Sequence, residues 1–145
     1  MMKKNVKCLM MFAAVALLFV GCTKTNGEPQ QLADYEYDFF SEEEKAALLH
    51  KPSDYENQVA DEIIANTTMR PYAGKREYEA QEYSYEAHKI GCQINDVDGM
   101  VWVKYTEIAV DKDGYNYSSS GINCVWYVEK NSKGEWEIVK SREHP

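Results

Sequence analysis

Four β-rich runs separated by three turn signals occupy residues 90–141, and no other feature constrains the fold as strongly. Asp98-Gly99 and Asp113-Gly114 suit two-residue hairpin loops, because both central residues of a type I′ turn adopt positive φ. At residues 131–134 we predict a three-residue loop, with Gly134 left-handed and a G1 bulge after it. Together the turns predict a four-stranded antiparallel meander.

The turns also predict which side chains share a face. The first turn sets Cys92 opposite Tyr105, and the third sets Val128 opposite Ile138. Because side chains alternate along a strand, the whole register yields one apolar face. Its members are Cys92, Ile94, Val101, Val103, Tyr105, Ile122, Cys124, Trp126, Val128, Trp136 and Ile138.

The opposite face carries Met100, Trp102, Val125 and Tyr127 among polar residues. One interpretation is an ordinary surface with some aromatic pairs, since folded surfaces expose many apolar atoms. The other is an interaction face for a protein partner or for a homodimer.

Cys92 and Cys124 are predicted to flank the same middle strand. An oxidising compartment would favour a disulfide between them. However, two strand spacings amount to about 9.6 Å, which exceeds the ~7 Å Cα separation that a disulfide allows. We therefore expect two buried free thiols.

Two helices are expected before the sheet. Ser41 and Glu44, and again Ser53 and Glu56, have the spacing of a capping box. Pro52 ends the first helix, because the residue before a proline avoids the helical region.

The second helix is expected at about residues 54–66. Tyr55, Val59 and Ile63 form an apolar stripe at helical spacing, which indicates packing against the sheet. Residues 76–89 are harder to assign, and we expect a strand with a bulge near residues 88–89.

Tyrosine is unusually frequent, with 11 residues in the chain. Its ring is apolar and its hydroxyl polar, which suits stacking on sugars or gripping peptides. A candidate binding pocket is expected between the second helix and the apolar face, near Tyr55, Tyr85 and Tyr105.

Helices followed by an antiparallel sheet predict an α+β domain over residues 35–145, with two N-terminal helices packed on one face of a curved four-stranded meander. This order, closing on Gly134, Trp136 and Ile138, resembles the NTF2-like cone or the related cystatin-like fold. Families with these folds include enzymes and binding proteins, so the resemblance implies no particular function.

Residues 1–21 read as a signal peptide, with a basic start and an uncharged run of 13 residues at positions 8–20. The run ends at Gly21-Cys22, which resembles the lipobox of bacterial lipoproteins. That resemblance implies lipidation of Cys22, membrane anchoring and a tether over residues 22–34. Thr23 follows Cys22 in place of Asp, and no acidic run adjoins it, so we expect the outer membrane, facing the periplasm.

The domain is acidic. Without the three leader lysines, 13 basic residues remain against 24 acidic ones, a net charge of −11. Nucleic acid is therefore an unsuitable partner, because its recognition needs a basic surface.

No motif for catalysis or metal binding is found. Asp-x-Asp-Gly occurs at residues 96–99 and 111–114, but the outer ligands of a calcium loop are missing. The three histidines lack ligand or dyad spacing, and no nucleophile or phosphate-loop motif occurs. We expect no cofactor, no metal and no enzymatic activity.

Three functional hypotheses follow. The first is a non-enzymatic domain that binds a small molecule or a protein. The second is an acidic inhibitor or immunity-like protein with a basic partner, whose affinity would fall steeply with salt. The third is a pocket hydrolase with paired carboxylates.

The anchor prediction is directly testable. Cys22→Ser removes the thiol that would carry the lipid, so we expect loss of palmitate labelling and release of the protein from the membrane fraction. Cys8→Ser, within the leader, is the matched control and leaves both unchanged. Equal membrane binding of the Cys22→Ser protein would contradict the lipobox interpretation.

Overall fold

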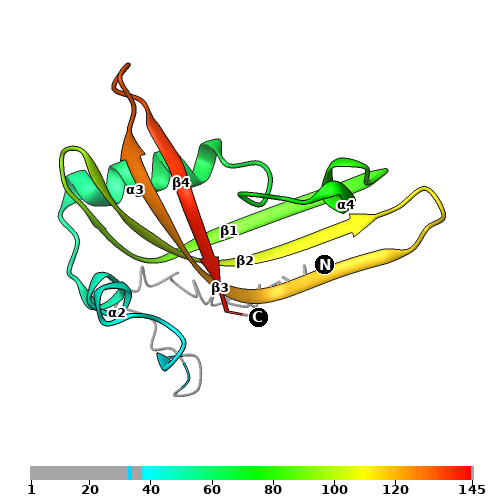
Figure 1. The fold of residues 1–145 in the computed structure, drawn as a ribbon, viewed down its shortest axis with the longest axis horizontal. Coiled ribbons are helices and arrows are strands. Elements are labelled where there is room, and N and C mark those ends of the chain that lie inside the picture. Colours follow the sequence, from blue (N-terminus) through cyan, green and yellow to red (C-terminus); the bar gives the residue numbers. More distant parts are fainter. Residues whose placement is uncertain (1–32, 34–36, 145) are drawn as a thin grey trace, which may run out of the picture.

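The computed structural model describes Ala33 and residues 37–144, so the leader, Cys22 and nearly all of the tether lie outside the described residues. The elements are α2 (Glu42–Leu49), α3 (Asp54–Asn66), α4 (Lys75–Tyr78), β1 (Glu82–Ile94), β2 (Asp98–Val110), β3 (Asn116–Lys130) and β4 (Trp136–Glu143). The strands form one antiparallel sheet in the order β1-β2-β3-β4 (Figure 1). The predicted α+β class is confirmed. Within the described part of the chain, no helix is both long and apolar enough to span a bilayer.

The third turn has the predicted geometry. Val128 pairs with Ile138 and Lys130 with Trp136, and Gly134 has a φ of 82°. The glycine is needed there, because a side chain would be strained in the left-handed region.

The second turn differs from its prediction but preserves the register. Its loop has three residues, closed by a 3.0 Å hydrogen bond from the Asp111 N–H to the Tyr115 carbonyl. The extra loop residue moves the register by one, and a bulge at Gly121, with a φ of 69°, moves it back. Tyr105 therefore pairs with Ile122, as predicted.

The first turn was predicted wrongly. Asp98 and Gly99 lie in β2, and Asn95 closes the loop by accepting hydrogen bonds from the N–H groups of Val97 and Asp98. Cys92 consequently pairs with Val101 across the two strands instead of with Tyr105. Since the displacement is an even number of residues, every β1 side chain near the turn keeps its predicted face.

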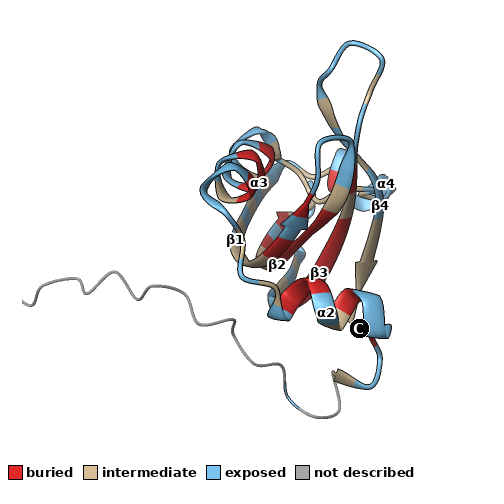
Figure 2. Cartoon of the chain, turned by 90° about the vertical axis from the view of Figure 1, so that its left-hand side faces the viewer, coloured by how far each residue is buried: buried red, intermediate tan, exposed pale blue. Residues whose placement is uncertain are grey.

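The helices pack on opposite faces of the sheet, so the prediction that both cover one face is wrong (Figure 2). α3 places Val59, Ala60 and Ile63 against the predicted apolar face. α2 places Ala47 and Leu48 against the other face, which was too apolar to leave in water.

The predicted interaction face at Met100, Trp102, Val125 and Tyr127 is therefore not an exposed surface. Trp102 and Val125 are fully buried, and Met100 is 8% exposed. The Trp102 indole N–H donates a 2.8 Å hydrogen bond to the Glu44 carbonyl on α2. This contact satisfies the only polar atom of the indole, so the ring can be buried completely.

Both predicted capping boxes are present, and their glutamates also bind the sheet. In each box, one carboxylate oxygen accepts the N-cap backbone N–H, at 2.6 Å for Glu44 and 2.7 Å for Glu56. The other oxygen reaches a strand. Glu44 accepts the Tyr127 hydroxyl at 2.8 Å, and Glu56 accepts the Ile94 N–H at 3.0 Å.

Cys92 and Cys124 are free and buried, on β1 and β3 at either side of β2, as predicted. Burial raises the pKa of Cys92 to about 11 and that of Cys124 to about 12. Both thiols are therefore protonated at neutral pH and poorly reactive.

The pH dependence of stability is predicted from Glu56. Burial acts to raise its pKa, but hydrogen bonds from Ser53 and Ile94 and the charge of His50 outweigh burial and lower it from 4.5 to about 2. A depressed carboxyl pKa stabilises the fold above the unfolded value, and that contribution is lost as the pH falls from about 4.5 to 2. Glu56→Gln should lower the free energy of unfolding by about 2 kcal/mol at pH 7 in urea titrations.

The difference between wild type and Glu56→Gln should close as the pH falls through this window. Glu62→Gln, on an exposed position of the same helix, is the control and should change stability by less than about 0.5 kcal/mol. A difference that stays constant from pH 7 to pH 2 would show that the Glu56 charge is not what stabilises the fold.

Candidate functional site

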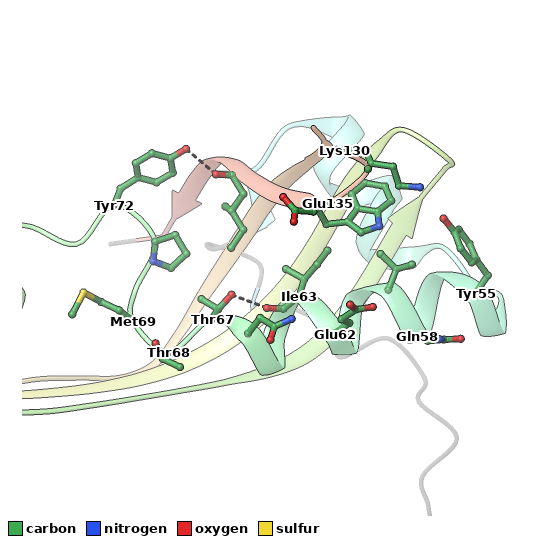
Figure 3. A pocket seen from close by; sticks show the side chains of 16 residues that line it. Tyr55, Gln58, Glu62, Ile63, Thr67, Thr68, Met69, Tyr72, Lys130 and Glu135 are labelled. Carbon is green, nitrogen blue, oxygen red and sulfur yellow. Dashed lines mark hydrogen bonds between the residues drawn. The ribbon is translucent and has the colours of Figure 1, made fainter. Parts of the chain in front are cut away.

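A groove of about 920 Å³ lies between α3, the loop that follows it and the β3–β4 hairpin (Figure 3). We call it the α3 groove. Its lining residues are Tyr55, Gln58, Val59, Glu62, Ile63, Asn66, Thr67, Thr68, Met69, Pro71, Tyr72, Lys130, Gly134, Glu135, Trp136 and Ile138.

One wall of the groove is a row of polar side chains on α3. Gln58, Glu62 and Asn66 are exposed and follow at intervals of four residues, so they lie on one helical face about 6 Å apart. Within the described residues, none of these three side chains has a hydrogen-bond or ion-pair partner. We call this row the polar ladder, and it leaves donors and acceptors available to a ligand.

The floor beside the ladder is apolar. Val59 and Ile63 belong to the buried core under α3, and Ile138 of β4 packs against that core. The opposite wall carries Trp136, whose ring centroid lies 5.0 Å from the Lys130 ammonium. The groove thus combines an apolar floor and an aromatic ring with polar walls, the usual composition of a binding site.

The loop after α3 supplies the rim through Tyr72. This residue has a φ of 59°, an unusual conformation for a bulky side chain. Its hydroxyl donates a 3.1 Å hydrogen bond to the Ile138 carbonyl on β4. Such backbone strain persists only where surrounding contacts enforce it, and it concentrates at functional sites.

A partly buried ion cluster holds this loop against the sheet. The Arg70 guanidinium contacts Glu77 of α4, Glu107 of β2 at 3.1 Å and Glu143 of β4 at 3.4 Å. The backbone N–H of Arg70 also donates a 3.1 Å hydrogen bond to the Tyr83 hydroxyl of β1. The Arg70 cluster, formed by the arginine and its three glutamates, therefore ties the rim to three strands and α4.

The electrostatics of the cluster indicate a structural role. Burial raises the pKa of Glu107, and the Arg70 charge opposes that rise. Burial also acts to raise the pKa of Glu77, but backbone N–H groups and Arg70 lower it.

A hollow of about 380 Å³ adjoins the cluster. No group of metal-ligating side chains occurs among the residues that the structure describes.

The three tyrosines of the predicted pocket do not line one cavity in common. Tyr55 lines the α3 groove, whereas Tyr105 lines the hollow beside the Arg70 cluster. Tyr85 packs on Tyr105 with ring centroids 5.4 Å apart, against the core. The Tyr105 hydroxyl donates to Glu143 at 3.0 Å.

Sequence reasoning overlooked most of the α3 groove. The polar ladder was visible, because Gln58, Glu62 and Asn66 repeat at the same spacing as the apolar stripe beside them. Nothing in the sequence indicated the positive φ of Tyr72 or its contact with Ile138, which depend on the tertiary arrangement.

Comparison with protein-family models, with curated proteins and with solved structures finds no match to this chain. The structure establishes an α+β fold with a four-stranded antiparallel sheet. Function must therefore be argued from the chemistry of the site itself.

Removal of the Arg70 guanidinium should destabilise the rim. Arg70→Ala leaves the largely buried Glu77 and Glu107 without their cation, so we expect the free energy of unfolding to fall by about 3 kcal/mol in urea. Proteolysis within residues 67–74 should accelerate as well. Arg76→Ala, which removes an exposed arginine lying over Tyr117, should cost less than about 1 kcal/mol. Equal losses in both variants would contradict the assigned role.

Proposed function

We propose that this protein is a binding protein that is anchored by lipid in the outer membrane and faces the periplasm. In this proposal Cys22 carries the anchor, residues 22–34 form the tether, and residues 35–145 present the α3 groove. A tether of this length reaches at most about 45 Å from the membrane. The observation that carries the proposal is the groove, whose polar ladder has no partner within the described residues.

The lining chemistry favours binding over catalysis. No histidine, cysteine or serine is among the lining residues, so the commonest nucleophile–base pairs, Ser–His and Cys–His, are missing from the groove. Its acids, Glu62 and Glu135, are exposed, whereas a catalytic carboxyl usually needs a shielded environment to tune its pKa.

The order of helices followed by a four-stranded meander supports a relationship to NTF2-like or cystatin-like domains, which we include in the proposal. Helices cover part of each face of this sheet, with a groove beside α3 and close packing under α2. A protein partner or homodimer would accordingly need a surface other than Trp102 and Val125.

The proposal is tested by obstructing the groove. The full-length protein, in mild detergent, is incubated with periplasmic extract and examined by native mass spectrometry. We expect a small-molecule or peptide adduct that Asn66→Trp reduces at least tenfold, since a bulky ring on the ladder would occupy the groove.

Ala65→Trp is the matched control, because Ala65 is an exposed neighbour on the same helix that does not line the groove. It should retain the adduct. An adduct that both variants retain would place the binding site elsewhere, and the absence of any adduct in the wild type would remove support for a binding function.

A further inference from the structure

We propose that the α3 groove binds a neutral oligosaccharide. This inference rests on the proposed binding function and specifies its ligand class. A sugar ring has an apolar C–H face and a rim of hydroxyl groups, each both donor and acceptor. A matching site needs aromatic rings for the faces and amide or carboxylate groups for the rims.

The polar ladder supplies the groups for the hydroxyl rims. Gln58 and Asn66 each offer a carbonyl acceptor and two N–H donors, and Glu62 between them offers two acceptor oxygens. Adjacent members are one helical turn apart, so the ladder extends about 12 Å along the groove. Contacts repeated over this length suit a chain of sugar units better than a single small molecule.

Aromatic rings supply the surfaces for the apolar faces. Tyr55 and Tyr72 lie at opposite ends of the groove and are 44% and 64% exposed (Figure 3). Trp136, the first residue of β4, lines the wall opposite the ladder. The position of Tyr55 and Tyr72 at both ends of one groove places an apolar ring within reach of each end of an extended ligand.

The charges in the groove favour a neutral ligand. Lys130 is the one basic residue among the lining residues, against Glu62 and Glu135. Lys130 already lies over the Trp136 ring, with its ammonium 5.0 Å from the centroid. Phosphate, sulfate and polyanionic glycans need clustered cations, which this lining lacks.

An extended peptide added as a fifth strand beside β4 is the main competing occupant, and two features disfavour it. The Tyr72 hydroxyl already occupies the Ile138 carbonyl. A bulge follows at once, since Val128 pairs with Ile138 whereas Tyr127 pairs with Lys140. Strand addition needs a regular row of free N–H and C=O groups, and bulges and covered carbonyls interrupt that row.

The test uses tryptophan fluorescence of the full-length protein in mild detergent. Trp102 and Trp126 are fully buried and Trp136 is half-buried, so a spectral shift on titration reports chiefly on the groove. The probes are cellohexaose, maltohexaose, xylohexaose and mannohexaose, with short uncharged peptides titrated in parallel.

We expect saturable binding of at least one hexasaccharide. The double variant Gln58→Ala with Asn66→Ala should weaken it at least tenfold, because hydrogen bonds to two ladder members are lost. Asn57→Ala is the control, since Asn57 lies on α3 outside the groove and should leave the affinity unchanged.

Each contrary outcome has a distinct meaning. Peptide binding without saccharide binding would overturn the saccharide inference and leave the proposed binding function in place. Saccharide binding that the double variant does not weaken would overturn the assignment to this groove. If neither class binds, the saccharide inference fails, and the native adduct experiment alone would then decide the binding function.

Discussion

The structure depends on two buried carboxylates that join the helices to the sheet. Glu44 and Glu56 each occupy the third position of a helix, where one oxygen accepts the N-cap N–H and the other accepts a donor on a strand. A carboxylate that is largely withdrawn from water must be fully hydrogen-bonded. Sliding or rotating either helix would break these hydrogen bonds at a large cost in free energy. The same local capping signal thus fixes tertiary packing as well as helix ends.

The two helices that carry these glutamates cover different faces of the sheet. α2 buries the side that contains Trp102, and α3 buries the side that contains Trp126. The parts of the sheet that carry Trp102 and Trp126 are then unavailable as flat interaction surfaces. A groove lies at the margin where α3 passes the β3–β4 hairpin, and the Arg70 cluster fixes the loop that closes this margin.

The three hairpins show how far local turn chemistry reaches. Gly134 specified its loop, since both the loop length and the positive φ follow from this residue. At the second turn the longer loop and the bulge at Gly121 shift the register in opposite directions, so the predicted pairing of Tyr105 with Ile122 is preserved. At the first turn the Asn95 side chain closes the loop by accepting a hydrogen bond from the Val97 N–H. Gly99 lies in the strand, and it must be glycine because a Cβ there would lie 2.5 Å from the Gln93 carbonyl oxygen. An Asp-Gly pair therefore indicates a nearby turn without fixing its position.

The sequence by itself determined the two longer helices, the four-stranded meander, the apolar face, both capping boxes and the separation of Cys92 from Cys124. These follow from periodicity and from contacts within a few residues, which local composition encodes directly. Tertiary structure alone decided that α2 covers the second face, that Tyr55 lies apart from Tyr85 and Tyr105, and that Tyr72 closes the α3 groove. Those outcomes depend on which distant surfaces meet, and an amphipathic pattern states that a face is buried without stating what buries it.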